Sequence, residues 1–461
     1  MKQNAKGVNR KIRALFVVHA QIRNRRKRSR ETERAASIPC PALALNNSLD
    51  ICVIGAGAAG LMAAIAGGRA GASVRVLDGA KHIGAKILVS GGSRCNVTNE
   101  YVAPARFHGE GAAPFVSRIL RSFSPADTHR FFERIGVELK LEETGKFFPT
   151  TDSSRTVLNA LLSELSASGA VLSTQTNVSD IEKTEGGWKI STPDEEIWAR
   201  AIIVCTGGLA LPKTGSDGRG YRLARKFGHS IIETTPALSP LVSHLAPHAK
   251  FSGLTLPVRL QFRRKNGGKI AAYDGSFLFT HFGYSGPAAL NLSRHVAREK
   301  SENAGSGVSL RLLPHVEDGG EAGFWHEFSG RNAKKTFAGA MSELLPGKLA
   351  ATMPALAKIA PQITLGRFDT EQIANVKAAL FEMPLPVDEV ADYVKAETTA
   401  GGVSLAEIEP ATMMSRLAPG LFFAGEVCDV DGWLGGYNFQ WAWSSGVVAG
   451  RAAAKLAKSA A

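Results

Sequence analysis

Three glycines near residue 55 have the spacing of a turn that binds phosphate groups. Gly55, Gly57 and Gly60 form the pattern GxGxxG directly after the apolar residues 51–54. The first glycine of such a pattern allows a sharp turn, the second lets the backbone approach a pyrophosphate, and the third lets a helix pack closely on its sheet. Asp78 follows Gly60 by 18 residues, a separation typical of the carboxylate that binds a ribose hydroxyl. These residues predict a site for an adenine dinucleotide.

The elements around these glycines have the order that a dinucleotide site requires. Residues 50–54 have strand character, residues 61–70 favour a helix, and residues 73–77 form a second strand. The unpaired N–H groups of the first helical turn attract phosphate oxygens. We therefore expect the cofactor to contact Gly55, Gly57, Ala58, Ala59, Gly60 and Asp78.

Residues 81–99 are dense in small and hydrogen-bonding side chains and poor in periodic hydrophobic ones. This composition predicts a loop that lies over a ligand, with a plain surface loop as the alternative. Donors in this segment suit phosphate or ribityl oxygens, and two basic side chains add positive charge. The candidate cofactor-binding residues of this segment are Lys86, Ser90, Gly91, Gly92, Arg94 and Asn96.

Two later segments are also rich in glycine. Residues 201–205 have the character of a buried strand that leads into glycines, which would bring backbone close to the cofactor. Residues 420–424 form another strand, and a helix expected over residues 439–454 begins after a glycine pair. Such a helix N-terminus stabilises the negative charge that develops on a reduced flavin, although a helix that simply docks on the sheet would have the same pattern. These segments add Thr206, Gly207, Gly208, Gly425, Glu426, Gly436, Tyr437 and Asn438 to the candidate cofactor site.

The middle of the chain differs in character from both ends. Residues 258–264 and 269–279 alternate as strands joined through an Asn-Gly hairpin signal, and the stretch that follows them becomes mostly helical. We therefore predict an α/β fold in which a Rossmann-like domain is split by an inserted β-rich, barrel-like domain with a small helical subdomain. The predicted parts are residues 49–235 and 397–461 for the Rossmann-like domain, 236–396 for the insertion, and about 318–382 for its helical lobe.

Positive charge is concentrated at the N-terminus. The formal net charge is +14, and residues 1–34 hold twelve Lys or Arg against two acids, so this tail accounts for +10 and the other 427 residues for +4. We expect residues 1–48 to be a basic, disordered tail or to follow from a start codon placed too early. A mitochondrial presequence, or contact with nucleic acid or an anionic surface, is the alternative. The nearly neutral body does not favour a nucleic-acid partner.

The cysteines are scattered singly and form no CxxC pair. This pattern predicts a reducing, cytoplasmic location and no disulfide framework or metal site. Disulfide reductases place two cysteines four residues apart after a nucleotide unit of this kind, and Cys95 has no such partner, so we expect it to pack or to lie beside a ligand. No apolar run reaches the roughly 18 to 20 residues that a membrane span needs. The five cysteines are Cys40, Cys52, Cys95, Cys205 and Cys428.

Four motifs in order carry a family resemblance. They are KILVSGGSRCNVTN at 86–99, FTHFGYSGP at 279–287, TTAGGV at 398–403, and FAGEVCDVDG at 423–432 with GGYNFQWA at 435–442. Together they resemble the bacterial BaiN-like family of NAD(P)/FAD-dependent flavoproteins, some of which are called aminoacetone oxidase family proteins. The likeness covers residues 49–455 and leaves out the basic tail.

This resemblance implies FAD as the cofactor and a two-part FAD domain split by an inserted β-rich domain with a helical subdomain. It implies that the first glycine motif and Asp78 hold the ADP half, and that the segment after Lys86 lines the middle of the cofactor. It places the C-terminal glycines near the ribityl chain and the flavin. Ser93 stands where the family's loop has a third consecutive glycine, which affects the expected shape of that loop.

We predict an FAD-dependent oxidoreductase that transfers a hydride between the flavin and a small or steroid-like organic substrate. No second GxGxxG unit follows the first, so NAD(P)H would reach the flavin only transiently, as an electron donor. The candidate catalytic residues are His281 and Tyr284, in a glycine-rich hairpin, and Arg94. The alternatives are a flavin-dependent RNA-modifying enzyme, suggested by the basic tail, and a non-enzymatic FAD-binding redox sensor.

Overall fold

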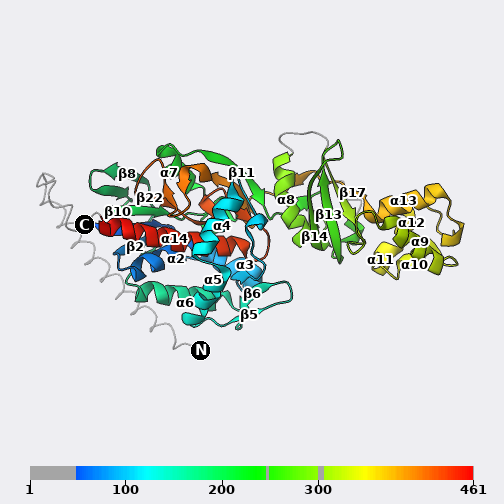
Figure 1. The fold of residues 1–461 in the computed structure, drawn as a ribbon, viewed down its shortest axis with the longest axis horizontal. Coiled ribbons are helices and arrows are strands. Elements are labelled where there is room, and N and C mark those ends of the chain that lie inside the picture. The colour runs from blue at the N-terminus through cyan, green and yellow to red at the C-terminus, as the bar shows by residue number, and fades with distance from the viewer. Residues whose placement is uncertain (1–47, 245–248, 300–305, 460–461) are drawn as a thin grey trace, which may run out of the picture. The chain divides into compact units, whose positions relative to one another are not determined.

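The structure, a computed structural model, describes residues 48–244, 249–299 and 306–459 (Figure 1). Residues 1–47 of the predicted basic tail, Cys40 among them, lie outside this range. Within the described part of the chain, no helix is both long enough and apolar enough to cross a bilayer. Two clusters of buried apolar side chains form the cores of the molecule.

The first core surrounds a nine-stranded sheet with a parallel centre. The apolar residues of β1 (Leu49–Ile54) are almost completely buried, because α2 (Ala58–Arg69) and α14 (Tyr437–Ser459) contact this strand. The carboxyl ends of parallel strands meet at one edge of a sheet, so the glycine segments that follow β1, β10 (Glu196–Val204) and β22 (Leu421–Phe423) meet there too. In sheet order, the parallel strands are β22 (Leu421–Phe423), β10 (Glu196–Val204), β1 (Leu49–Ile54), β2 (Val74–Leu77) and β7 (Val171–Ser173).

Close packing of α14 on α2 joins the C-terminal segment to the first glycine motif. A Cβ atom placed on Gly446 would lie 2.4 Å from the carbonyl oxygen of Ala59, and one on Gly450 would lie 2.1 Å from that of Ala63. Both positions therefore need glycine, since the helix backbones approach too closely for a side chain. The helix predicted over residues 439–454 is present and longer than expected.

The second core belongs to the β-rich insertion. The chain enters it after β11 (Ile231–Ala237) and returns through β19 (Thr398–Val403), and these two strands pair antiparallel. We propose the domain boundaries at residue 236, within β11, and at residue 396, two residues before β19. Between them lies a seven-stranded antiparallel sheet against which α8 (Pro287–Glu299) packs. In sheet order, its strands are β17 (Met383–Leu385), β16 (Gly307–Arg311), β13 (Thr255–Arg263), β14 (Lys269–Phe279), β15 (Gly283–Ser285), β12 (Leu241–Val242) and β18 (Glu389–Val390).

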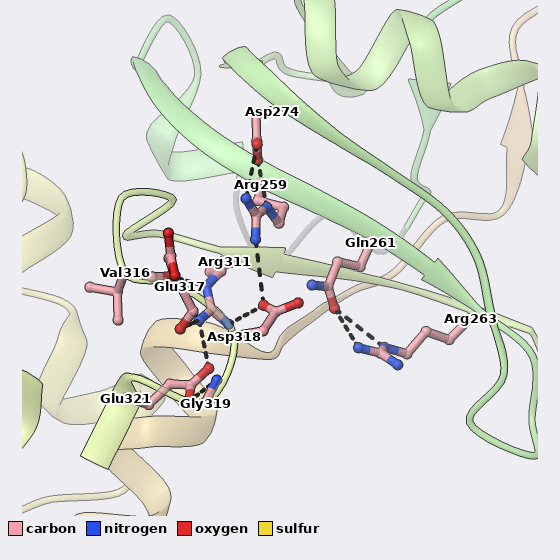
Figure 2. Close-up of polar contacts among 10 residues, drawn as sticks. All are labelled: Arg259, Gln261, Arg263, Asp274, Arg311, Val316, Glu317, Asp318, Gly319 and Glu321. Carbon is pink, nitrogen blue, oxygen red and sulfur yellow. Dashed lines mark hydrogen bonds and ion pairs between the residues drawn. The ribbon is translucent and has the colours of Figure 1, made fainter. Parts of the chain in front are cut away.

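Arg311 at the end of β16 connects the inserted sheet to the helices that follow it. Its side chain is only 4% exposed, and its guanidinium donates hydrogen bonds to the carbonyl oxygens of Val316 and Glu317 and to the carboxylate of Glu321 (Figure 2). Asp318 forms a further ion pair with it at 3.3 Å. These bonds fix the turn that leads into α9. The helices of this region are α9 (Glu321–Arg331), α10 (Phe337–Met341), α11 (Gly347–Ala350), α12 (Met353–Leu356) and α13 (Thr370–Phe381).

One local expectation differs from the structure. We predicted a loop over residues 81–99, but α3 (Ala85–Ser93) occupies the middle of this segment. Ala85, Lys86 and Leu88 are good helix formers, and Ile87 is buried against the rest of the protein, so these residues form a helix. The helix loses regular geometry at Ser90, Gly91 and Gly92, where backbone torsions leave the helical region.

A buried polar cluster joins α8 to the nucleotide-binding part of the chain. Arg294 donates two hydrogen bonds to Asp431 of β23 (Asp431–Gly432), at 2.7 and 3.1 Å, and both side chains are nearly inaccessible. The hydroxyl of Tyr273 lies 3.3 Å from Nε2 of His108 and 3.0 Å from Nε2 of His295. Burial lowers the pKa of each histidine to about 3, and the Arg294 charge adds to this effect.

The two imidazoles predict sensitivity to acid. Each holds its proton less tightly in the folded chain than in the unfolded chain, so the stability they contribute is complete above about pH 6.5 and is lost as the pH falls toward 3. We expect the free energy of unfolding to fall by on the order of a few kcal/mol per imidazole across that window. In the double variant His108→Gln and His295→Gln, the free energy of unfolding should depend less on pH. Urea unfolding at several pH values measures this dependence. Exposed His281→Gln is the control, and an unchanged slope in the double variant would contradict the prediction.

Candidate functional site

A cavity of about 990 Å³ lies at the carboxyl edge of the parallel strands. This volume is near the upper end of the ~300–1,000 Å³ typical of small-molecule and cofactor sites. Segments from both ends of the sequence line it, so the early and late glycine motifs converge on one space. The predicted cofactor residues that line it are Gly55, Gly57, Ala58, Ala59, Asp78, Lys86, Ser90, Gly91, Gly92, Arg94, Asn96, Thr206, Gly207, Gly425, Glu426, Gly436 and Asn438.

Three predicted cofactor residues do not line the cavity. Gly60 packs beneath the turn, where a Cβ atom would lie 1.8 Å from the carbonyl oxygen of Gly55. Gly208 packs against the side chain of Thr399, with a Cβ position 2.4 Å from its hydroxyl oxygen. Tyr437 is buried and its hydroxyl accepts a hydrogen bond from Arg106 at 2.5 Å. These three residues therefore pack behind the residues that line the cavity.

The glycine turn leaves one position open toward the cavity. Gly55 has a φ of 102°, and a Cβ atom there would lie 2.5 Å from the carbonyl oxygen of Cys205, so both torsion and packing require glycine. A Cβ atom on Gly57 would have no protein atom within 4 Å. Since Gly57 is also the N-cap of α2, its backbone can approach a ligand phosphate at the helix N-terminus.

Asp78 ties the glycine turn to the end of β2. Its Oδ2 accepts a hydrogen bond from the N–H of Ala56 at 2.6 Å, and its Oδ1 accepts one from the N–H of Ala80 at 2.8 Å. Each carboxylate oxygen can accept more than one bond, and Asp78 lines the cavity. The same side chain can therefore hold the turn and accept a ribose hydroxyl.

Lys86 and Glu426 join the two distant halves of the site. The ammonium of Lys86 lies 2.6 Å from one carboxylate oxygen of Glu426, and both side chains are less than a quarter exposed. The other carboxylate oxygen accepts hydrogen bonds from the N–H and the hydroxyl of Thr399. This ion pair therefore fixes Lys86 and Glu426, which are 340 positions apart in the sequence, at the cavity wall.

The irregular C-terminal part of α3 contains a run of left-handed residues that explains the family's glycines. Gly91, Gly92 and Ser93 have φ values of 55°, 69° and 68°. Glycine adopts this region freely, whereas another residue is strained there by about 1–3 kcal/mol. Ser93 is exposed, so its side chain meets no obstacle, but its left-handed backbone conformation lowers the stability of the folded protein.

Ser93→Gly is expected to stabilise the protein. The relief of strain exceeds the extra ~0.4–1 kcal/mol of unfolded-state freedom that glycine brings, for a net gain of roughly 1 kcal/mol. Urea unfolding measures the change. Ser163→Gly, at an exposed position inside α6 (Ser154–Ala167), is the matched control and should lose about 0.5 kcal/mol. If both variants lost the same free energy of unfolding, Ser93 would not be strained.

Comparison with known proteins decides the family. A family model described as the HI0933-like protein Rossmann domain matches residues 49–452. The chain belongs to this family. The resemblance to BaiN-like flavoproteins, predicted from four motifs, is thereby confirmed, as are the α/β fold and FAD as the cofactor. The HI0933-like chain is an FAD-dependent oxidoreductase.

Three relatives are similar along nearly their whole length. A 3-dehydro-bile acid delta(4,6)-reductase of Clostridium scindens is 32% identical over 406 residues, which are 87% of this chain and 98% of that protein. A ribosomal RNA dihydrouridine synthase of Escherichia coli is 32% identical over 399 residues, 86% of this chain and 96% of that protein. The protein of the same name from Haemophilus influenzae is also 32% identical, over 85% of this chain and 95% of its own.

The cavity of this HI0933-like protein has groups that suit FAD. Asn96 Oδ1 and Thr206 Oγ1 line it, and both are buried without a hydrogen-bond partner among the described residues. Buried acceptors and hydroxyls of this kind are costly unless a ligand satisfies them. The turn at Gly57, the N-terminus of α2 and these two side chains would hold the nucleotide and ribityl groups. FAD supplies hydride transfer at this place.

Arg94 lines the cavity but is already engaged. Its guanidinium lies 2.6 Å from a carboxylate oxygen of Glu142 and 3.4 Å from one of Asp152, and it stacks 3.9 Å from the ring centre of Phe148. The hydrogen bond to Glu142 is the main reason that the pKa of Arg94 is raised. Two acids thus compensate the charge that we expected to bind a substrate oxygen.

The other two catalytic candidates do not line the cavity. Tyr284 is fully buried in the core of the inserted sheet, where it stacks on Phe277 with ring centres 5.5 Å apart, and burial raises its pKa to about 12. His281 is exposed and contacts the ring of Phe282. A catalytic role for either residue would require a substrate that extends well beyond the cavity.

Thiol chemistry is not favoured at this site. Cys95 is fully buried, and burial raises its pKa to about 12, so little thiolate forms. Cys205 lines the cavity and its pKa is also raised by burial. The part of the chain described by the structure contains no cluster of His, Cys, Asp or Glu that could hold a metal ion.

Sequence reasoning missed several cavity residues. Lys146, Leu238, Glu397 and Leu434 line the cavity and come from segments without a nucleotide-binding pattern. Glu397 directly precedes the TTAGGV motif, which is the one signal that could have drawn attention to it. Because these residues lie outside the glycine motifs, they are candidates for the substrate end of the cavity.

Proposed function

We propose that this protein reduces a carbon–carbon double bond conjugated with a carbonyl group, with NAD(P)H as the transient electron donor. The names of the relatives support this reaction class. One relative is named as a delta(4,6)-reductase of a 3-dehydro-bile acid, and two are named for making dihydrouridine. A 4,6-diene beside a 3-oxo group and the uracil ring share one feature, a double bond in conjugation with a carbonyl. Similarity that spans 95% or more of each relative carries the proposal.

The donor and the acceptor would use the same cavity in turn. The sequence has no second GxGxxG unit, so a nicotinamide cofactor has no dedicated nucleotide domain. The cavity volume of about 990 Å³ is suited to FAD with room for a ring beside it. Leu238 and Leu434 provide apolar wall for a steroid-like or other ring substrate, while Lys146 and Glu397 provide polar groups.

Stopped-flow spectroscopy tests the proposal. The FAD-loaded protein is mixed without oxygen with NADH or NADPH, and loss of the flavin absorbance identifies the donor. The reduced protein is then mixed with a 3-oxo-4,6-diene steroid, and rapid return of the absorbance is expected. The saturated 3-oxo steroid is the control acceptor and should leave the flavin reduced. Failure of both donors to bleach the flavin would instead favour a redox sensor that does not turn over.

Uridine in ribosomal RNA is the second candidate substrate. Two relatives are named as ribosomal RNA dihydrouridine synthases, and residues 1–34 have a net charge of +10 that would attract phosphates. Unmodified ribosomal RNA transcribed in vitro is incubated with the protein and donor, and dihydrouridine is measured by mass spectrometry. A chain without residues 1–48 should lose RNA affinity and retain steroid reduction. If the RNA stays unmodified while the dienone is reduced, the result favours a small-molecule substrate and rules out ribosomal RNA.

A further inference from the structure

Two cavity residues come from the points where the chain enters and leaves the insertion. Leu238 directly follows β11, and Glu397 directly precedes β19. The N–H of Glu397 donates a hydrogen bond to the carbonyl oxygen of Leu238 at 3.2 Å. Leu238 has a left-handed φ of 49°, which turns the chain at this crossing. The paired strands β11 and β19 therefore hold Glu397 at a fixed place on the cavity wall.

A lysine from a distant part of the sequence, Lys146, also lines the cavity and lies close enough to act electrostatically on this glutamate. Lys146 begins β6 (Lys146–Pro149), and its side chain passes Gly435 closely, since a Cβ atom on that glycine would lie 3.2 Å from Lys146 Cε. The amide of Asn99 donates a hydrogen bond to the carbonyl oxygen of Gly435 at 2.9 Å and so fixes this backbone. Lys146 thus sits beside the glycines that open α14.

The surroundings of Glu397 favour a protonated carboxyl group. Its side chain is exposed to the open cavity rather than enclosed by protein, but the protein atoms that surround it still reduce its hydration and raise its pKa above the usual value for glutamate. The Lys146 ammonium acts in the opposite direction and is the weaker influence. A cofactor and a substrate that fill the cavity would remove more water and strengthen the preference for the neutral form.

Several other charged side chains of the cavity wall are held in ion pairs. Lys86 pairs with Glu426, whose second oxygen is bound by Thr399. Arg94 pairs with Glu142. On the approach from the insertion, Lys395 lies over the ring of Phe282 at 4.4 Å. Within the described part of the chain, Glu397 and Lys146 line the cavity outside these pairs, so both can meet a substrate.

We propose that Glu397 is the proton donor of the reduction and that Lys146 binds the carbonyl oxygen of the substrate. This assignment depends on the proposed function. A hydride that reduced FAD would supply would form the new C–H bond at the β-carbon, and the electron pair of the double bond would move onto the carbonyl oxygen to give an enolate, which the Lys146 ammonium would stabilise. The α-carbon then takes a proton from the Glu397 carboxyl group. One hydride and one proton saturate the bond, and Glu397 regains its proton from water after product release.

Separate half-reactions of Glu397→Gln test the proton donor. Flavin reduction by NAD(P)H should proceed as in the wild type, whereas reoxidation by the dienone should slow by about 100-fold or more, the usual effect of losing a general acid. Wild-type reoxidation should decline as the pH rises through the pKa of Glu397, and the variant should show no such decline. Glu397→Asp keeps an acid and should recover part of the rate and the pH profile. Glu233→Gln, an exposed change on β11 outside the cavity, is the matched control.

The lysine has its own test. Lys146→Met should raise the KM for the dienone and slow its reduction at least roughly tenfold, and Lys146→Arg should restore most of the loss, because a cation is again present. Unchanged kinetics in Lys146→Met would overturn this role. The pH profile should still show the decline that belongs to Glu397.

A measurement without cofactor distinguishes this inference from the proposed function. A carboxyl group with a raised pKa in the folded chain destabilises the protein once the pH exceeds the unfolded value, so Glu397→Gln should melt higher than the wild type at pH 7 and equally at pH 4. Equal melting at both pH values, or normal reoxidation with an unchanged pH profile, overturns the role of Glu397. If no conjugated acceptor reoxidises the wild type, the proposed function fails even where the melting difference is found.

Discussion

Gly57→Ala is expected to abolish tight FAD binding while the protein stays folded. The backbone of Gly57 has a φ of −80°, which alanine adopts without strain, and the new methyl group would meet no protein atom within 4 Å. It would occupy the place where the backbone must approach a pyrophosphate. We expect FAD affinity to fall by about 100-fold, which corresponds to roughly 2.7 kcal/mol. Titration of the cofactor-free protein with FAD, followed by flavin fluorescence, measures the change.

Two further glycine variants control this experiment. Gly330→Ala lies in α9 with no atom within 4 Å of the new methyl group, so it should bind FAD normally. Gly60→Ala would place a methyl group 1.8 Å from a backbone oxygen and should disrupt the fold itself. Unchanged FAD affinity in Gly57→Ala, with a normal melting temperature, would show that the phosphates lie elsewhere.

Arg294→Met is expected to cost about 3–5 kcal/mol of stability, because it leaves the Asp431 carboxylate buried without a partner. The two side chains are 11% and 2% exposed and share two hydrogen bonds between α8 and β23. The double variant Arg294→Met with Asp431→Leu removes both charges and should recover most of the loss. Urea unfolding of the single and double variants measures the coupling between them.

A surface pair provides the comparison for this buried one. Arg331 and Glu327 lie 3.8 Å apart in α9 with side chains 65% and 74% exposed, so Arg331→Met should change the free energy of unfolding by less than about 1 kcal/mol. If Arg294→Met were equally mild, water would have to reach Asp431, and the contact between α8 and β23 would be looser than the structure indicates.

Local sequence determined the elements that carry the nucleotide site. An apolar strand, a GxGxxG turn, a helix and an acid at the end of the next strand are set by sterics within a few residues, and they recur in β1, α2 and β2. Strand β14 has the predicted limits 269–279 because its alternation and its hairpin turn are also local. The prediction of a loop over residues 81–99 was wrong in part. It followed from the glycines of this segment, whereas residues 85–89 form a helix.

Tertiary structure decided which residues meet at the cavity. Lys86 and Glu426 are 340 positions apart, and no spacing rule predicts that they form an ion pair. The register of β15 against β14 pairs Tyr284 with Phe279 and buries the tyrosine in the insertion, although its glycine-rich motif resembles a site. Glu397 becomes an acid candidate only because the strands at the two crossings bring it to the cavity wall, where the surrounding protein raises its pKa. Backbone torsions are local properties, whereas burial and the pKa depend on neighbours from the whole chain. The sequence alone therefore predicted the cofactor motif, and only the folded chain brought together the groups that we propose for catalysis.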